Sequence, residues 1–137
     1  MLDKAVISEY LKRAERAASS AYAPFSNLRV GAVVRLRDGR EFVGVNVENA
    51  SFGLTMCAER VALGAAVAAG ARPGDVELLA VASPDRPITP CGACRQVIAE
   101  FGHDIRVLFR ADGGADVLAH AGELLPALFS FGDGTRG

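Results

Sequence analysis

The sequence is poor in the residues that mark several large classes of protein. Its 137 residues include only three cysteines and two histidines, and the formal net charge is −1. A small, odd number of cysteines argues against a disulfide framework and fits reduced thiols in the cytosol. Polynucleotide-binding proteins usually carry a basic stripe, and none is present here, so the sequence predicts no nucleic-acid partner.

Long apolar runs and targeting signals are also missing. Half of the residues are hydrophobic, but no segment approaches the length of a membrane span. Asp3, Lys4 and Glu9 interrupt the apolar residues at the N-terminus, which predicts that this segment is not a secretory signal peptide. The sequence therefore predicts a cytoplasmic protein with no membrane partner. We expect 1–137 to form a single domain, with a flexible Gly-rich tail at 130–137.

The spacing of apolar residues predicts an α/β fold. The expected helices are 3–19, 57–69, 91–101 and 122–128. The expected strands are 28–36, 41–47, 76–82, 105–109 and a short one at 117–118, the first two joined by an Asp38-Gly39 turn and covered on both faces. This order predicts a three-layer α/β/α sandwich around a mixed sheet of about five strands.

All three cysteines lie at the starts of two expected helices. Cys91 and Cys94 form a Cys-x-x-Cys pair, and Cys57 begins the helix before it. Three thiolates suit one soft divalent metal, and Zn²⁺ is favoured because it accepts sulfur in tetrahedral geometry. Three protein ligands leave the fourth position open, as catalytic zinc sites require. The positive end of each helix dipole lowers the pKa of a thiol placed there.

The residues that follow Cys57 are suited to hydrolytic chemistry. Glu59 lies two residues beyond Cys57, where a carboxylate can act on a metal-bound water without binding the metal, as a general acid and base. Arg60 could donate a hydrogen bond to a ligand sulfur and offset the negative charge of three thiolates. Arg95, next to Cys94, is a weaker candidate for the same role.

These motifs resemble those of the zinc nucleoside deaminases, specifically the short homotetrameric cytidine deaminases. The segments that carry the resemblance are Cys57-Ala58-Glu59, Pro90-Cys91-Gly92-Ala93-Cys94, Tyr22-Ala23-Pro24-Phe25-Ser26, Val30-Gly31-Ala32, Asn46-Val47-Glu48-Asn49-Ala50 and Glu123-Leu124-Leu125-Pro126. The resemblance implies zinc-dependent deamination of cytidine and deoxycytidine in pyrimidine salvage, with release of ammonia. It also implies one Zn²⁺ per chain and a homotetramer whose pockets are completed by neighbouring subunits.

The substrate-binding residues are expected in part from the residues and in part from this resemblance. Asn46 and Glu48 alternate along an expected strand, so their side chains share a face and could clamp sugar hydroxyls. In the resembling family, this Asn-x-Glu holds the ribose, chiefly its 3′ hydroxyl. The resemblance also implies that the backbone around Ala58 hydrogen-bonds the pyrimidine carbonyl.

A pyrimidine also needs flat apolar walls. Phe52 and Phe129 match positions where the resembling family lines its pocket with aromatic rings. Leu28 stands where that family usually has a phenylalanine. We therefore expect one ring platform to be missing, with an effect on substrate affinity and on the range of substrates.

Two alternatives differ from a plain cytidine deaminase. The first is a deaminase of a modified cytosine nucleoside, such as the blasticidin-type deaminases, but the intact Asn46-Val47-Glu48-Asn49 segment favours the plain nucleoside. The second is a structural zinc site completed by His103 or His120, which would make the chain a binding or folding module. Neither histidine has zinc-knuckle spacing to a cysteine. An exchangeable solvent molecule as the fourth zinc ligand would distinguish an enzyme from such a module.

Overall fold

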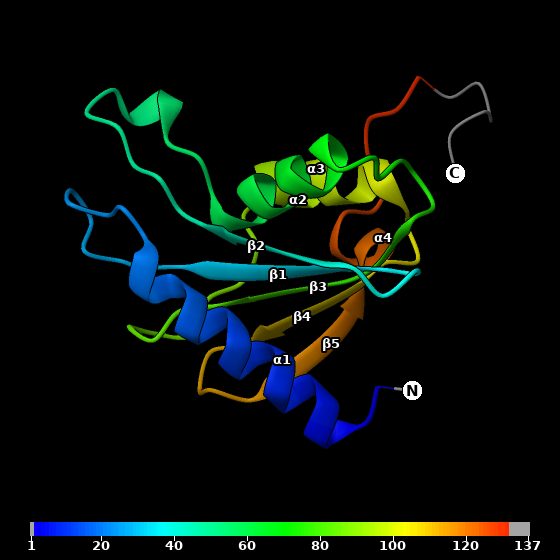
Figure 1. The fold of residues 1–137 in the computed structure, drawn as a ribbon, viewed down its shortest axis with the longest axis horizontal. Coiled ribbons are helices and arrows are strands. Elements are labelled where there is room, and N and C mark those ends of the chain that lie inside the picture. The colour runs from blue at the N-terminus through cyan, green and yellow to red at the C-terminus, as the bar shows by residue number, and fades with distance from the viewer. Residues whose placement is uncertain (1, 132–137) are drawn as a thin grey trace.

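A computed structural model of the protein describes residues 2–131, which fold into helices around one sheet (Figure 1). The α-helices are α1 (Lys4–Ala17), α2 (Ala58–Ala68), α3 (Gly92–Phe101) and α4 (Ala121–Leu124). The strands are β1 (Gly31–Leu36), β2 (Glu41–Val45), β3 (Val76–Ala82), β4 (Arg106–Arg110) and β5 (Asp116–His120). No helix within residues 2–131 combines the length and the apolar character needed to cross a membrane. From residue 132 onward, the expected flexible tail lies outside the described residues.

The strands form one mixed sheet in the order β2-β1-β3-β4-β5. β1 pairs antiparallel with β2 and β3, β3 runs parallel to β4, and β5 is antiparallel to β4. Two parallel strands need a crossover connection, and here α3 supplies it. The chain consequently leaves β2, β3 and β4 and enters β1 at the same edge of the sheet. Loops far apart in the sequence meet at this edge.

Helices cover both faces of the sheet, with α1 on one face and α2, α3 and α4 on the other (Figure 1). Successive strand residues point to opposite faces, so Val33 and Leu108 pack with α1, whereas Val34 and Val107 pack with the other helices. α1 begins at Asp3, whose carboxylate accepts a hydrogen bond from the backbone N–H of Val6 at 2.9 Å. The predicted three-layer fold with about five strands is confirmed.

Several expected elements are shorter than predicted, and one expectation about burial is wrong. β2 ends at Val45, two residues before the predicted end at 47, so Asn46 and Glu48 follow the strand and do not lie in it. β1 begins at Gly31 because the side chain of Asn46 binds the backbone of the preceding residues in place of a neighbouring strand. The last helix ends at Leu124 because Pro126 disfavours a helical conformation at the residue before it. β2 is an edge strand, and its Val43 is 54% exposed, so it is not covered on both faces.

Gly44 allows α2 to approach the sheet unusually closely. A Cβ atom on Gly44 would lie 2.4 Å from the carbonyl oxygen of Ala58 and 2.4 Å from the backbone nitrogen of Ala62. Both atoms belong to the backbone of α2, so neither can turn aside as a flexible side chain could. This contact sets the distance between the sheet and α2, the helix whose first turn contains Glu59.

We expect Gly44→Ala to destabilise the fold by about 3 kcal/mol or more, because the methyl group overlaps backbone atoms that can only move with the whole helix. For a chain of this size, that loss lowers the melting temperature by about 10 °C. Gly64→Ala is the matched control, since Gly64 is exposed within α2 and has open space around it. It should leave the melting temperature unchanged or raise it. Equal melting temperatures for both variants would contradict the close-approach argument.

Candidate metal centre and active site

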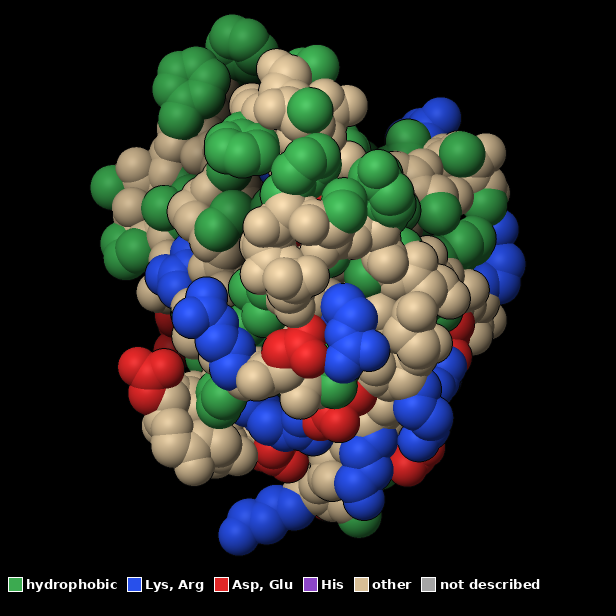
Figure 2. Space-filling view, turned by 90° about the vertical axis from the view of Figure 1, so that its left-hand side faces the viewer, with side chains coloured by type: hydrophobic (Ala, Val, Ile, Leu, Met, Phe, Trp, Pro, Cys, Tyr) green, Lys and Arg blue, Asp and Glu red, His purple; other side chains and the backbone are tan. Residues whose placement is uncertain are grey.

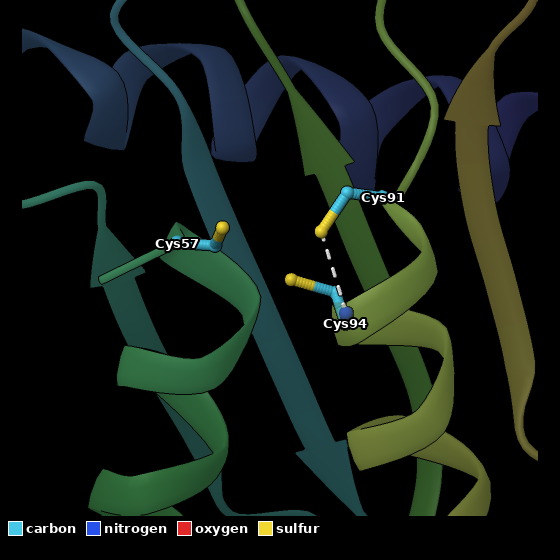
Figure 3. Close-up of side chains that lie close together, drawn as sticks. All are labelled: Cys57, Cys91 and Cys94. Carbon is cyan, nitrogen blue, oxygen red and sulfur yellow. Dashed lines mark hydrogen bonds between the residues drawn. The ribbon is translucent and has the colours of Figure 1, made fainter. Parts of the chain in front are cut away.

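The three cysteine side chains converge from the starts of two helices that lie side by side (Figure 3). Cys57 is the N-cap residue of α2 and Cys91 is the N-cap residue of α3, with Cys94 in the first turn of α3. Their Sγ atoms all lie within 4.8 Å of one another. A tetrahedral zinc with Zn–S bonds of about 2.3 Å spaces its sulfur atoms by about 3.8 Å. The donor set and its spacing therefore fit zinc.

The surroundings of Cys57 favour its thiolate. A hydrogen bond from the thiol of Cys94, with a further contribution from Arg60, lowers the pKa of Cys57 to about 5. The guanidinium of Arg60 lies 3.4 Å from the Sγ of Cys57 and 3.4 Å from the carbonyl oxygen of Thr55. Arg60 thus reaches both the sulfur and the backbone just before it, as a residue that offsets thiolate charge would.

Glu59 is buried beside the cysteines, with only 4% of its surface exposed. Burial is the main cause that raises its pKa, and the negative charge on Cys57 adds to the effect. A carboxyl group with a raised pKa exchanges protons nearer to neutral pH than an exposed one does. The position of Glu59 in the first turn of α2 follows directly from the placement of Cys57 at the N-cap.

A cavity of about 650 Å³ opens at the sheet edge beside this cluster. Its walls come from the segments before β1, after β2, after β3 and after β4, and from the start of α2. Cys57, Ala58, Glu59 and Cys91 line the cavity. The volume is within the usual range for small-molecule sites, and the cysteine cluster lies in its wall, where a bound small molecule could reach it.

Asn46 and Glu48 also line this cavity. Both side chains form hydrogen bonds with the loop that precedes β1. The Asn46 side chain accepts from the N–H of Val30 at 2.9 Å and donates to the carbonyl oxygen of Leu28 at 2.8 Å. The Glu48 carboxylate accepts from the Ser26 hydroxyl and from the N–H groups of residues 25 and 26. The Ser26 hydroxyl bond is the main cause that lowers the pKa of Glu48, which keeps Glu48 ionised near neutral pH.

The other expected pocket residues divide into two groups. Leu28 lines the cavity and lies in the loop before β1. Phe52 and Phe129 do not line it, and their side chains are 74% and 72% exposed. Phe52 packs edge-on against Phe25, with ring centroids 5.9 Å apart. These two rings therefore do not contribute to the wall of the pocket in their own chain.

Apolar side chains gather on the upper part of the face shown in Figure 2, whereas Lys, Arg, Asp and Glu side chains occupy its lower part. The loops that extend to the left in Figure 1 point toward the viewer on this face. Large exposed apolar side chains on these loops include Phe25, Phe52, Leu54 and Met56. A cluster of large exposed apolar side chains usually marks a surface that contacts another molecule.

Several residues that line the cavity were not expected from the sequence. They are Ser26, Val30, Thr55, Arg86, Pro87, Ile88, Thr89, Asp112 and Gly113. Most of them come from the loops after β3 and β4, which the parallel pairing of these strands brings together. No local sequence pattern identifies these residues as part of a pocket, because the loops that carry them come together only through the order of the strands in the sheet.

The two histidines lie apart from the cysteine cluster. Within residues 2–131, the group of metal-ligating side chains that forms around the cysteines contains no histidine. His120 precedes α4, and its Nδ1 lies 2.9 Å from a carboxylate oxygen of Glu123. His103 packs against Gly122. The fourth-ligand role that a structural zinc site would require of either residue therefore has no support from the geometry.

Comparison with known proteins gives consistent matches over most of the chain. Residues 4–110 match the family model described as the cytidine and deoxycytidylate deaminase zinc-binding region. A cytidine deaminase of Halalkalibacterium halodurans is 45% identical over 125 residues, which cover 90% of this chain and 93% of that protein. A blasticidin-S deaminase of Bacillus cereus is 36% identical over 92 residues, covering 61% of this chain and 65% of that protein.

The fold is similar to that of solved structures as well. The crystal structure of a cytidine deaminase from Burkholderia pseudomallei superimposes with a TM-score of 0.82 at 47% sequence identity. The match covers 89% of this chain and 98% of that chain. The similarity of the fold therefore extends over most of the chain.

Proposed function

Because this chain belongs to the family of zinc-dependent cytidine and deoxycytidylate deaminases, we propose that it hydrolyses cytidine and deoxycytidine to uridine and deoxyuridine with release of ammonia. The observation that carries the proposal is the buried Glu59 next to three converging cysteine thiols, all beside one cavity. Cys57, Cys91 and Cys94 would hold one zinc ion, and Glu59 would be the catalytic acid and base.

The protein's own groups handle the protons of this reaction. Zinc, when bound, supplies a polarised water molecule that can attack carbon 4 of the cytosine. The Glu59 carboxylate accepts a proton from that water and delivers it to N3 of the ring. It then takes the proton of the new hydroxyl group on carbon 4 and passes it to the amino group. The bond from carbon 4 to the amino nitrogen breaks as the carbonyl group of uridine forms, and ammonia leaves. The burial of Glu59 excludes bulk water that would otherwise exchange these protons.

The pocket walls hold the rest of the nucleoside. Glu48 is ionised. Within residues 2–131, each amide atom of the Asn46 side chain makes a single hydrogen bond, which leaves one donor and one acceptor for a ligand. We assign the sugar hydroxyls to these two residues and the pyrimidine carbonyl to the backbone near Ala58. Leu28 gives the ring an apolar contact.

Ammonia release from a panel of substrates tests the proposed function. The panel contains cytidine, deoxycytidine, cytosine, cytidine monophosphate, adenosine and blasticidin S. We expect rapid release from the two nucleosides and much slower release from the others. Blasticidin S as the best substrate would favour the alternative suggested by the Bacillus cereus relative. No release from either nucleoside would reject the proposal.

Glu48→Ala should reduce kcat/KM for cytidine far more than for free cytosine, because only the nucleoside has a sugar to bind. Loss of a hydrogen bond to a charged group predicts a decrease of about ten- to a hundredfold. Ser26→Ala is the control, since it removes the hydroxyl that supports Glu48 but keeps the carboxylate. It should change the cytidine-to-cytosine ratio much less. Equal losses for cytidine and cytosine in Glu48→Ala would remove the sugar-binding role.

Leu28→Phe should lower KM for cytidine about two- to twelvefold, with kcat little changed. A phenyl ring at this position in the cavity wall can stack on the pyrimidine, and most of that contact persists into the transition state. The ring also fills space, so bulky 5-substituted cytidines should become poorer substrates. An unchanged KM together with a lower melting temperature would show that the ring strains the loop and does not reach the substrate.

We further propose a cytoplasmic homotetramer that acts in pyrimidine salvage. Phe52 and Phe129 are largely exposed in the single chain, and in an assembly such rings could complete the pocket of a neighbouring subunit. Light scattering should give a mass four times that of the chain. A fully active monomer would contradict this assembly. Phe52→Ser should then shift the mass downward and raise KM together.

A further inference from the structure

Arg95 holds the backbone on both sides of Cys91. Its backbone N–H donates to the carbonyl oxygen of Cys91 at 2.9 Å. Its side-chain Nε donates to the carbonyl oxygen of Pro90 at 2.8 Å. These two carbonyl groups belong to the peptide bonds that flank the Cα of Cys91. One residue therefore fixes both peptide planes that set the direction in which the Cys91 side chain leaves the chain.

Cys91 needs this support more than Cys57 does. Cys57 follows Met56, whose N–H and carbonyl groups each pair with the backbone of Val47 at 2.9 Å. Cys91 is exposed and follows a loop between β3 and α3. Its Sγ accepts from the backbone N–H of Cys94, but over a longer distance of 3.4 Å. The backbone on the loop side of Cys91 is thus held by the Arg95 side chain.

The other end of the guanidinium reaches the C-terminal part of the described chain. Nη1 of Arg95 donates to the carbonyl oxygen of Leu124 at 3.1 Å, at the last residue of α4. Carbonyl groups at a helix end have no partner within the helix. A planar guanidinium can donate in two directions at once, which the single ammonium of a lysine does less well. Arg95 therefore bridges the metal-binding loop and α4.

We propose that Arg95 is a positioning residue that holds Cys91 in the geometry for zinc binding and ties that geometry to α4. From the sequence, Arg95 was instead a weaker candidate for offsetting thiolate charge, but its side chain donates to carbonyl oxygens. Arg60 is the residue whose guanidinium reaches a sulfur. This inference rests on the proposed function only in requiring that the three cysteines bind zinc.

The test measures zinc affinity by competition with a chelator, for the full chain and three variants. Arg95→Met keeps the length of the side chain but removes its donors, and should weaken zinc binding about 10- to 100-fold. Arg95→Lys should also weaken it, because an ammonium serves two separate carbonyl groups less well than a planar guanidinium does. Gln96→Met is the matched control on the same helix, since Gln96 donates to the carbonyl oxygen of Phe129 at 2.9 Å and not to the metal-binding loop. It should leave zinc affinity within about twofold.

A second measurement separates positioning from general stability. Hydrogen exchange in the backbone of residues 121–124 should increase in Arg95→Met and on removal of zinc from the parent, because the bridge couples the two regions. Zinc affinity unchanged in Arg95→Met, with only a lower melting temperature, would overturn the inference. An equal loss of zinc affinity in Gln96→Met would do the same. If Arg95→Met fails to fold, Arg95→Lys is judged by the same criteria. A parent that binds zinc but releases no ammonia from cytidine would reject the proposed function and leave this inference standing.

Discussion

Glu59→Gln should retain zinc and fold yet lose turnover by about 10²- to 10⁴-fold, the range typical of a lost general acid and base. The amide of glutamine has nearly the same shape as the carboxylate but cannot take up a proton. Metal analysis, a melting curve and cytidine turnover on the same preparation test the expectation. Loss of zinc would make Glu59 a ligand, and near-normal kcat would assign the proton transfer to another residue. Glu9→Gln, on the exposed surface of α1, is the matched control and should behave like the parent.

The same variant carries a prediction about pH. Burial raises the pKa of Glu59, and only the ionised carboxylate can accept a proton from water. Turnover of the parent should therefore fall as the pH falls through this raised pKa, and Glu59→Gln should lack that acidic decrease. A folded-state pKa above the unfolded value also means that the ionised form destabilises the fold at neutral pH. The variant should consequently melt at the same temperature as the parent or higher.

The sequence predicted the sheet well because its strands are defined by local composition. The run of β-branched residues and leucine at 76–82 gave β3 at its observed bounds and in its central position. The errors lie where a side chain or a proline overrides the apolar pattern. Val30 was expected in a strand, but its N–H donates to the side chain of Asn46. Leu125 was expected in a helix, but it precedes Pro126.

The metal cluster was predictable because the sequence has so few cysteines and places all of them at helix starts. The pocket wall was only partly predictable. Arg86 and Asp112 follow different strands, and only the parallel pairing of β3 and β4 brings their loops to one edge. The role of Arg95 was also not predictable from the sequence. Its side chain donates to backbone carbonyl groups, and every residue has one, so residue type does not identify the partners. Phe52 and Phe129 were expected in the pocket, but they do not line the cavity of the single chain.

Cys91→Ala should abolish both zinc binding and turnover, and Cys91 is the most informative of the three cysteines to replace. Cys94 is fully buried, so its replacement by alanine would also disturb packing in the core. Cys91 is exposed, so the loss of its sulfur leaves no cavity. With two thiolates remaining, the site falls short of the three protein ligands that catalytic zinc sites have. Metal analysis after dialysis should give about one zinc per chain for the parent and almost none for the variant.

The melting temperature of this variant decides whether the zinc is catalytic or structural. Two apolar clusters of buried side chains, one on each face of the sheet, hold the fold without help from the cysteines of the metal site apart from the packing of Cys94. Zinc-free parent and Cys91→Ala should therefore both remain folded and melt at similar temperatures. A structural zinc would instead make folding depend on the metal, so that both proteins unfold. Full zinc occupancy in Cys91→Ala would show that Cys91 is not a ligand, and the assignment of the metal site would fail.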